Sequence, residues 1–327
     1  MNTAYSACIA WAEQQIRKAD PATQSVTSLV KRRAWSTVWK LDTPGGRFYL
    51  KEAAPGFDVE APLLMELCRW RPAAVVQLSA VDTAHGWILT HDAGRMLHDQ
   101  MFDDFACGRA QLRSILLAYA EIQADSLHDD APLFARMLED RSPVAIPRSF
   151  AGIVENEALL RAGGATADEL RQPSRWLQGV ERLCTDAEAL NLPIAFEHGD
   201  LHTSNIMIAT DGTTRIADWG DACWAIPLHS LVMCLDDVVG RHKIARDDAW
   251  LVQLTADYFD VWRRYGYDLD FGRAMTIVRA LVPVSEVLQW SRGIDQMPAE
   301  DRAVMARHVV KSLRALTRSM SVCGRAI

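Results

Sequence analysis

The chain has 327 residues, and its 35 lysines and arginines against 42 aspartates and glutamates give a formal net charge of −7. A composition of 49% hydrophobic and 24% charged residues is that of a folded globular protein, which excludes the disordered and fibrous classes. The length predicts two domains or lobes. Because neutralising phosphates requires a dense basic face, the acidic balance argues against a nucleic-acid partner.

Cysteine usage and hydropathy indicate the compartment. The seven cysteines are scattered and include no C-x-x-C pair, which argues against both a disulfide framework and a cysteine-rich zinc site. Residues 1–20 mix apolar with charged side chains and lack the apolar stretch of a secretory signal. No uncharged run of about 18 apolar residues occurs that could span a membrane. We therefore expect a cytoplasmic protein without a membrane partner, and the oligomeric state stays open.

Residues 1–92 are expected to form a small α+β lobe. Helical spacing covers residues 3–18 and 58–71. β-Branched and aromatic runs predict strands at residues 25–32, 35–41, 47–51, 75–81 and 87–90. A Thr-Pro-Gly-Gly turn at residues 43–46 joins the second and third of these strands. We expect a five-stranded antiparallel sheet with one helix, followed by a hinge at residues 91–94.

Residues 93–327 are expected to form a larger, mainly helical lobe. Apolar residues recur at helical spacing from Leu112 to Ile122, and later helical patterns cover residues 231–239, 250–265, 271–290 and 303–320. The exception is residues 194–219, where short apolar runs alternate with polar turns and predict a small hairpin. The fold class is therefore α+β, with a sheet lobe followed by a helical lobe.

The densest group of polar residues in an apolar setting lies beside this hairpin. It reads His-Gly-Asp-Leu-His-Thr-Ser-Asn over residues 198–205, and Asp218 follows thirteen residues later. Asp200 supplies a carboxylate that can orient or deprotonate a hydroxyl group. Asn205 and Asp218 lie at the two ends of the hairpin, and Mg²⁺ prefers oxygen ligands of this kind. These residue types match phosphoryl transfer, which needs positioning and charge neutralisation.

The spacing H-x-D-x-x-x-x-N followed by D-x-G is the catalytic arrangement of protein kinases, here with Gly199 after the histidine and Trp219 before the final Gly220. With these changes the chain resembles the aminoglycoside phosphotransferase and choline kinase family of kinase-like small-molecule phosphotransferases, whose loop commonly reads H-G-D-L-H-x-x-N. The resemblance is most specific at residues 196–222 and, by lobe order, covers about residues 25–320. It implies a bilobal protein-kinase-like fold.

The resemblance implies an enzyme, a kinase that moves the γ-phosphoryl group of Mg-ATP to a hydroxyl of a small molecule such as an amino alcohol or an aminoglycoside. In this reaction Asp200 is expected to accept or orient the acceptor proton, while Asn205 and Asp218 bind Mg²⁺. Only nine residues separate Asp218 from Pro227. This spacing leaves no long activation loop to hold a peptide, so a protein acceptor is disfavoured.

The resemblance also implies phosphate-binding residues in the first lobe. Lys51, at the end of the third strand, is expected to contact the α- and β-phosphates of ATP, with Glu60 as its partner and Glu66 as a rival. The loop that would cover the phosphates contains no glycine. Ser36 or Thr37 is therefore expected to donate hydrogen bonds to phosphate in place of bare backbone.

Two further regions are expected to contact ligands. Thr90 and Asp92 lie in the segment that links the lobes, where the family presents backbone groups to adenine, and the choice between ATP and GTP stays open. Asp221 follows the second half of the motif, and Glu286 lies on a late apolar helix. Together with the net negative charge, these acids predict an acceptor pocket that attracts an amine.

Two alternatives to an active kinase remain from the sequence. A metallohydrolase could use His198, Asp200 and His202 as zinc ligands, although no further histidine-rich motif supplies another ligand. A catalytically silent nucleotide-binding regulator is the second alternative. The presence of Asp200, Asn205, Asp218 and Lys51 argues against it. The glycine-free phosphate loop keeps it open, and so does Ser230, which stands where the family commonly has an aspartate that braces the catalytic loop.

Overall fold

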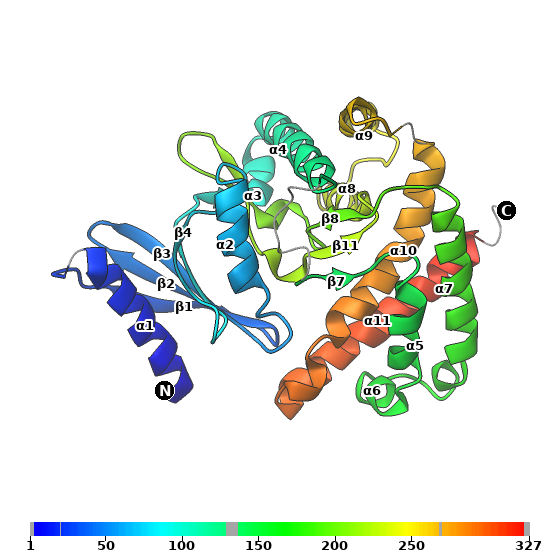
Figure 1. Ribbon diagram of the computed structural model, residues 1–327, viewed down its shortest axis with the longest axis horizontal. Helices are drawn as coiled ribbons and strands as arrows, with labels where there is room; N and C mark the ends of the chain where they lie inside the picture. Colours follow the sequence, from blue (N-terminus) through cyan, green and yellow to red (C-terminus); the bar gives the residue numbers. More distant parts are fainter. Residues whose placement is uncertain (1–2, 20, 129–136, 268–269, 324–327) are drawn as a thin grey trace.

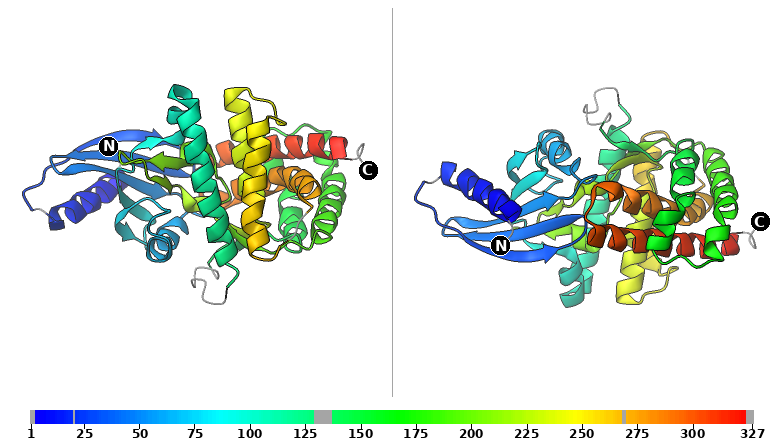
Figure 2. Two further views of the ribbon diagram at one scale, coloured as in Figure 1. Left: turned by 90° about the horizontal axis from the view of Figure 1, so that it is seen from above. Right: turned by 90° about the horizontal axis from the view of Figure 1, so that it is seen from below.

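A computed structural model describes residues 3–19, 21–128, 137–267 and 270–323, and Figure 1 shows them as two lobes. In both views of Figure 2 the blue sheet lobe lies at one end, and the green, yellow and red helices of the large lobe lie at the other. The α+β class and the bilobal arrangement predicted from the sequence are confirmed. Among the described helices, none is long and apolar enough to cross a membrane.

The small lobe is a five-stranded antiparallel sheet. Its elements in chain order are α1 (Thr3–Ala19), β1 (Val26–Arg32), β2 (Ser36–Thr43), β3 (Gly46–Ala53), α2 (Glu60–Trp70), β4 (Leu78–Asp82) and β5 (Trp87–His91). The strands are ordered β1-β2-β3-β5-β4. Helix α1 covers the sheet because Cys8, Ala12 and Ile16, spaced by one helical turn, pack on Leu41 and Leu50.

The fourth strand differs from its predicted range of residues 75–81. Strand β4 begins only at Leu78, because Val75 instead forms an isolated parallel bridge with Ile216 of the large lobe. The neighbouring amide of Val76 donates to the Ile216 carbonyl at 3.2 Å. The apolar run of residues 75–81, which the sequence predicts as one strand, is thus divided between the two lobes.

The large lobe is mainly helical and contains two small three-stranded sheets. The helices are α3 (Leu97–Asp103), α4 (Phe105–Asp125), α5 (Ile146–Val154), α6 (Glu157–Ala162), α7 (Pro173–Glu188), α8 (His229–His242), α9 (Ala249–Arg264), α10 (Phe271–Ser291) and α11 (Ala299–Cys323), with short 3₁₀ turns at Glu169–Arg171, Thr203–Asn205, Trp219–Asp221 and Ile294–Gln296. The strands are β6 (Arg95–Met96), β7 (Glu139–Asp140), β8 (Ala195–Glu197), β9 (Ile206–Ile208), β10 (Thr214–Ile216) and β11 (Cys223–Ala225). One sheet is ordered β10-β9-β6 and the other β7-β11-β8.

These two small sheets position the polar loops. Strands β9 and β10 form the predicted hairpin, with Ile206 opposite Ile216. Strand β8 ends at Glu197, immediately before the loop of residues 198–205. Below the loops, Phe196 stacks on Trp219 with ring centroids 5.4 Å apart, inside the main apolar core. The loops that carry Asp200 and Asp218 therefore pack on a buried pair of stacked aromatic rings.

The connection between the lobes makes a close backbone contact. Gly94 has a φ of 93°, and its amide donates to Asp92 Oδ1 at 3.0 Å. A Cβ atom at this position would lie 2.0 Å from the carbonyl oxygen of Ile208 in the hairpin. Only glycine combines this backbone conformation with so close an approach.

We expect Gly94→Ala to destabilise the protein, because alanine at positive φ costs about 1–3 kcal/mol and its methyl group also overlaps Ile208. Urea unfolding curves measure the loss. The control is Gly212→Ala, which also has a positive φ of 83° but no atom within 4 Å of the added Cβ. Equal losses in the two variants would contradict the proposed backbone contact.

Candidate active site

A lysine held between two carboxylates joins the lobes. Lys51 Nζ on β3 lies 2.5 Å from Glu60 Oε2 at the start of α2, and it also donates to Asp218 Oδ1 of the large lobe. Burial alone would lower the pKa of Lys51, but the charges of Asp218 and Glu60 raise it, so the ammonium group stays protonated. Glu66 pairs instead with Arg69 at 2.6 Å. Of the two rival glutamates, the structure brings Glu60 to Lys51.

Asp218 has an unusual backbone. Its φ and ψ are 63° and 58°, which is the left-handed region that few non-glycine residues adopt. The preceding Ala217 fixes this turn, because its amide donates to the Asn205 carbonyl at 2.8 Å. Burial would raise the pKa of Asp218, but the charge of Lys51 outweighs burial and lowers that pKa to about 2. The site therefore holds an ionised carboxylate in a strained conformation, as is common where a ligand is bound.

His198 supports the loop with both ring nitrogens. The amide of Asp200 donates to Nδ1 at 3.2 Å, and Nε2 lies 3.0 Å from the Ala217 carbonyl. Because Nδ1 accepts, Nε2 carries the proton and donates. Burial lowers the pKa of His198 to about 4, so the ring is neutral near pH 7. The histidine therefore links the Asp200 loop to the segment before Asp218.

Asn205 has one free ligand atom. Its Nδ2 donates to the Asp200 carbonyl at 2.9 Å, while its Oδ1 accepts no hydrogen bond from any described residue. Asp218 likewise uses Oδ1 for Lys51. An amide oxygen and a carboxylate oxygen thus remain available in one place, a donor set that fits Mg²⁺.

Carboxylates surround Asp200. Burial, followed by the nearby charges of Asp221, Asp218 and Glu286, raises the pKa of Asp200 well above its ordinary value. Asp221 forms an ion pair with Arg292, whose guanidinium also donates to the Gly220 carbonyl at 3.0 Å. Glu286 accepts a hydrogen bond from Ser312 at 2.8 Å. Asp221 therefore has a cation partner, whereas the bonded partner of Glu286 is a neutral hydroxyl group.

The geometry disfavours the zinc alternative. Both ring nitrogens of His198 are bonded to backbone groups. The Nδ1 atom of His202 accepts from the Ser204 amide at 3.2 Å, and its Nε2 lies 3.7 Å from Asp200 Oδ2. Within the described residues, no group of three or more histidine, cysteine, aspartate or glutamate side chains could hold a metal ion.

A cavity of about 350 Å³ opens between the lobes, and Asp200, Asp221 and Glu286 are not among the residues that line it. Lys51, Thr90, Asn205 and Asp218 line it, together with apolar side chains from both lobes, which are Val30, Val38, Leu64, Val76, Ile88, Ala93, Met96 and Met207. The cavity has an apolar side and a charged side. This is the form of a small-molecule site with a few convergent polar groups.

Three residues expected to bind nucleotide do not line this cavity. Ser36 and Thr37 are buried at the start of β2, where they pair with the end of β3. Asp92 accepts from the Gly94 amide and lies 3.5 Å from an Arg47 nitrogen. Ser36 and Thr37 are therefore part of the sheet, and the Asp92 side chain bonds within the hinge. In their place the cavity receives Lys31, whose position on β1 gave no signal in the sequence.

The glycine-free loop between β1 and β2 is packed against the large lobe. Trp35 meets Trp290 of α10 edge to face at 5.1 Å, and Trp290 stacks on His308 of α11 at 4.5 Å. Arg32 at the end of β1 lies 3.5 Å from both Glu300 and Asp301. The loop therefore connects the lobes through its own side chains.

The family of the chain follows from a comparison with known sequences. Residues 30–267 match the model of the phosphotransferase enzyme family, known as APH. No curated protein sequence matches the chain significantly.

Solved structures with the same fold differ widely in sequence. A choline kinase from Streptococcus pneumoniae superposes with a TM-score of 0.64 at 10% identity, over 96% of this chain and 98% of that one. An ethanolamine kinase from Plasmodium vivax gives 0.62 at 9% identity, over 94% and 85%. A thermostable mutant of the aminoglycoside phosphotransferase APH(4)-Ia, in ternary complex with ADP and hygromycin B, gives 0.54 at 14% identity, over 94% and 98%.

These likenesses show the fold, and the family match covers well over half of the chain. The resemblance found in the sequence is therefore confirmed. The chain belongs to the phosphotransferase enzyme family of small-molecule kinases, with the bilobal protein-kinase-like fold.

Proposed function

We propose that the protein transfers the γ-phosphoryl group of Mg-ATP to a hydroxyl group of a small molecule in the cytoplasm. The observation that carries this proposal is the contact of Lys51 with both Glu60 and Asp218 beside the cavity that Asn205 also lines. In this proposal residues 1–92 form the nucleotide-binding lobe, and residues 93–327 carry the catalytic loop and the acceptor site.

The cavity offers matching surfaces for a nucleotide. Its apolar side chains can enclose a base, and Thr90 and Ala93 lie at the hinge. The amide of Asp92 donates to the Arg47 carbonyl and that of Gly94 to Asp92 Oδ1, while no described residue accepts a hydrogen bond from the Ala93 amide. A free amide at this place can bind the edge of a base. The charged ammonium of Lys51 then neutralises the phosphates.

The oxygens of Asn205 and Asp218 would hold Mg²⁺. The bound ion would supply neutralisation of phosphate charge. Two hydrogen bonds position the side chains that would bind the ion. Asn205 donates to the Asp200 carbonyl, and Lys51 donates to Asp218.

Asp200 is the group we assign to the acceptor. The acceptor oxygen forms a bond to the γ-phosphorus, the bond from that phosphorus to the β–γ bridging oxygen breaks, and the acceptor proton passes to the Asp200 carboxylate. His198 does not take this proton, since both of its nitrogens are bonded to backbone groups. It keeps the loop in place.

An amine on the acceptor fits the remaining charges. Glu286 lies close enough to raise the pKa of Asp200 and has no cation partner among the described residues, whereas Asp221 has Arg292. Structural neighbours named choline kinase and ethanolamine kinase support the same class of acceptor. We propose an amino alcohol or an aminosugar.

Asp200→Ala tests the assigned chemistry. We expect turnover to fall roughly 100- to 10,000-fold, the range for loss of general acid–base catalysis, with Mg-ATP affinity changed only a few-fold. ADP release with a panel of amino alcohols and aminosugars measures turnover, and calorimetric titration measures affinity. The control is Asp260→Asn, an exposed partner of Arg263 on α9.

Near-normal turnover in Asp200→Ala would remove Asp200 from the mechanism. A wild-type protein that binds Mg-ATP but releases no ADP with any acceptor would instead support the silent regulator.

Asn205→Ala and Asp218→Asn test the metal ligands. Each removes one oxygen ligand or one charge, so we expect the gain in ATP affinity produced by Mg²⁺ to shrink. Titrations with Mg²⁺ and with EDTA measure this gain, and Asp260→Asn should keep it. One tightly bound zinc ion per chain in metal analysis would contradict the assignment and favour a hydrolase that uses His198 and His202.

The amine is tested by the salt dependence of KM. Attraction between exposed charges weakens as salt rises past about 0.15 M, where the screening length is about 8 Å. We therefore expect KM for an amine acceptor to rise with salt more than KM for ATP, and Glu286→Gln to reduce the rise. A screen in which only neutral or anionic hydroxyl compounds are phosphorylated would refute the amine and leave the kinase assignment intact.

A further inference from the structure

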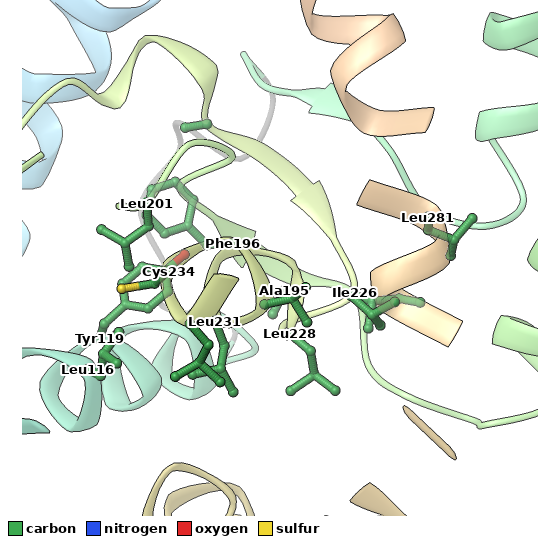
Figure 3. Close-up of a cluster of buried hydrophobic side chains, with 14 of the residues drawn as sticks. Leu116, Tyr119, Ala195, Phe196, Leu201, Ile226, Leu228, Leu231, Cys234 and Leu281 are labelled. Carbon is green, nitrogen blue, oxygen red and sulfur yellow. The ribbon is translucent and has the colours of Figure 1, made fainter. Parts of the chain in front are cut away.

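A buried carboxylate lies directly behind the loop that carries Asp200. Glu197 is the last residue of β8 and its side chain is fully buried. Its chain neighbour Phe196 belongs to the apolar cluster that Figure 3 shows together with Tyr119 and Leu201. Within the described part of the chain, no lysine, arginine or histidine lies within ion-pair distance of Glu197. A buried charge without a cation must be held by hydrogen bonds.

Backbone amides and side-chain hydroxyls converge on the Glu197 carboxylate, and the Gln123 side chain also bonds to it. The backbone amides of His229 and Ser230, at the start of α8, donate to Oε1 and Oε2, each at 3.1 Å. The Tyr119 hydroxyl donates to Oε2 at 3.0 Å, and so does the Ser230 hydroxyl. The N-terminal end of a helix also favours negative charge. These contacts explain how an anion is kept inside the core.

The same two hydroxyls hold the catalytic loop. The His198 amide donates to the Tyr119 oxygen at 2.7 Å, and the Gly199 amide donates to the Ser230 oxygen at 3.3 Å. A hydroxyl has one proton and two lone pairs. Because Glu197 takes the protons of Tyr119 and Ser230, their lone pairs face the two backbone amides that precede Asp200. The charge of Glu197 therefore orients the loop through two hydroxyl groups.

Ser230 lies between the Glu197 carboxylate and the Gly199 amide of the catalytic loop. The family resemblance leads one to expect an aspartate there, bracing the catalytic loop from α8. We propose that Glu197 is a positioning residue that supplies this carboxylate from β8, so that Asp200 is held in its reactive place although residue 230 carries no charge. This inference rests on the role proposed above for Asp200.

Moving the carboxylate from position 197 to position 230 tests the proposal. In Glu197→Gln the amide group donates where two hydroxyls now donate, so at least one hydroxyl turns away from the loop. We expect kcat to fall about 10- to 100-fold, a range typical for loss of an outer-shell partner, with little change in the KM values. In the double variant Glu197→Gln/Ser230→Asp, the new carboxylate replaces the Ser230 hydroxyl, whose oxygen lies between the Gly199 amide and the side chain of residue 197. We expect this carboxylate to restore most of the lost kcat.

The measurements use ADP release from Mg-ATP with ethanolamine, and with water as the acceptor when none is added, at pH 8. Burial raises the pKa of Glu197 to about 7, so this pH keeps it ionised. Ser230→Asp alone should lower both kcat and the unfolding temperature, because it places two carboxylates together in the core. The control Glu188→Gln, on the exposed side of α7, should change neither quantity.

Hydrogen exchange of the His198 and Gly199 amides gives a readout that needs no acceptor. It should quicken in Glu197→Gln and slow again in the double variant. If Glu197→Gln does not fold, Tyr119→Phe removes only the hydroxyl that meets the His198 amide, and kcat should still fall. Unchanged kcat in Glu197→Gln, or in this substitute, would overturn the proposal, and so would a folded double variant without recovery. Failure of the proposed function is distinct, because wild-type protein would then release no ADP.

Discussion

The fold depends on one charged contact across the two lobes. Lys51 comes from the sheet lobe and Asp218 from the large lobe, and Glu60 holds the lysine from the side of α2. A single buried lysine would be costly, but two carboxylates keep it protonated and make the separation of the lobes unfavourable. The strained backbone of Asp218 persists because this contact and the hairpin beneath it fix the residue from two directions.

Aromatic side chains and an arginine add further contacts between the lobes. Trp35 packs on Trp290, and the Arg292 guanidinium lies 4.4 Å from the centre of the Phe57 ring while it neutralises Asp221. A glycine-rich phosphate loop gains its closeness to a ligand from bare backbone, which leaves the loop itself free to move. Here the tryptophan ties the loop to the large lobe. The lobes are thus also held together by aromatic packing and by a guanidinium group.

Much of the molecule could be predicted from local patterns. The strands of the small lobe, helix α2 and the hairpin that carries Asn205 follow from alternation, helical spacing and turn residues, all of which act over a few positions. Strands β6 and β7 could not be predicted, since two residues leave no period to detect. The partners of Glu197 were also hidden, because Tyr119 is 78 residues away. The one signal was a glutamate that ends an apolar strand.

Ser230 and Glu197 show that a sequence motif specifies a residue type at one position and not the interaction that the residue makes. A motif fixes which residue type stands at a position, whereas the loop requires only a negative charge near the start of α8 that can take the protons of two hydroxyls. Strand β8 and helix α8 both reach that point, so either can supply the carboxylate. A serine in place of aspartate at position 230 therefore predicts weaker support of the catalytic loop only if no neighbouring residue supplies the carboxylate. In this structure the Ser230 hydroxyl donates to Glu197 and accepts from the Gly199 amide, so it links the buried carboxylate to the loop.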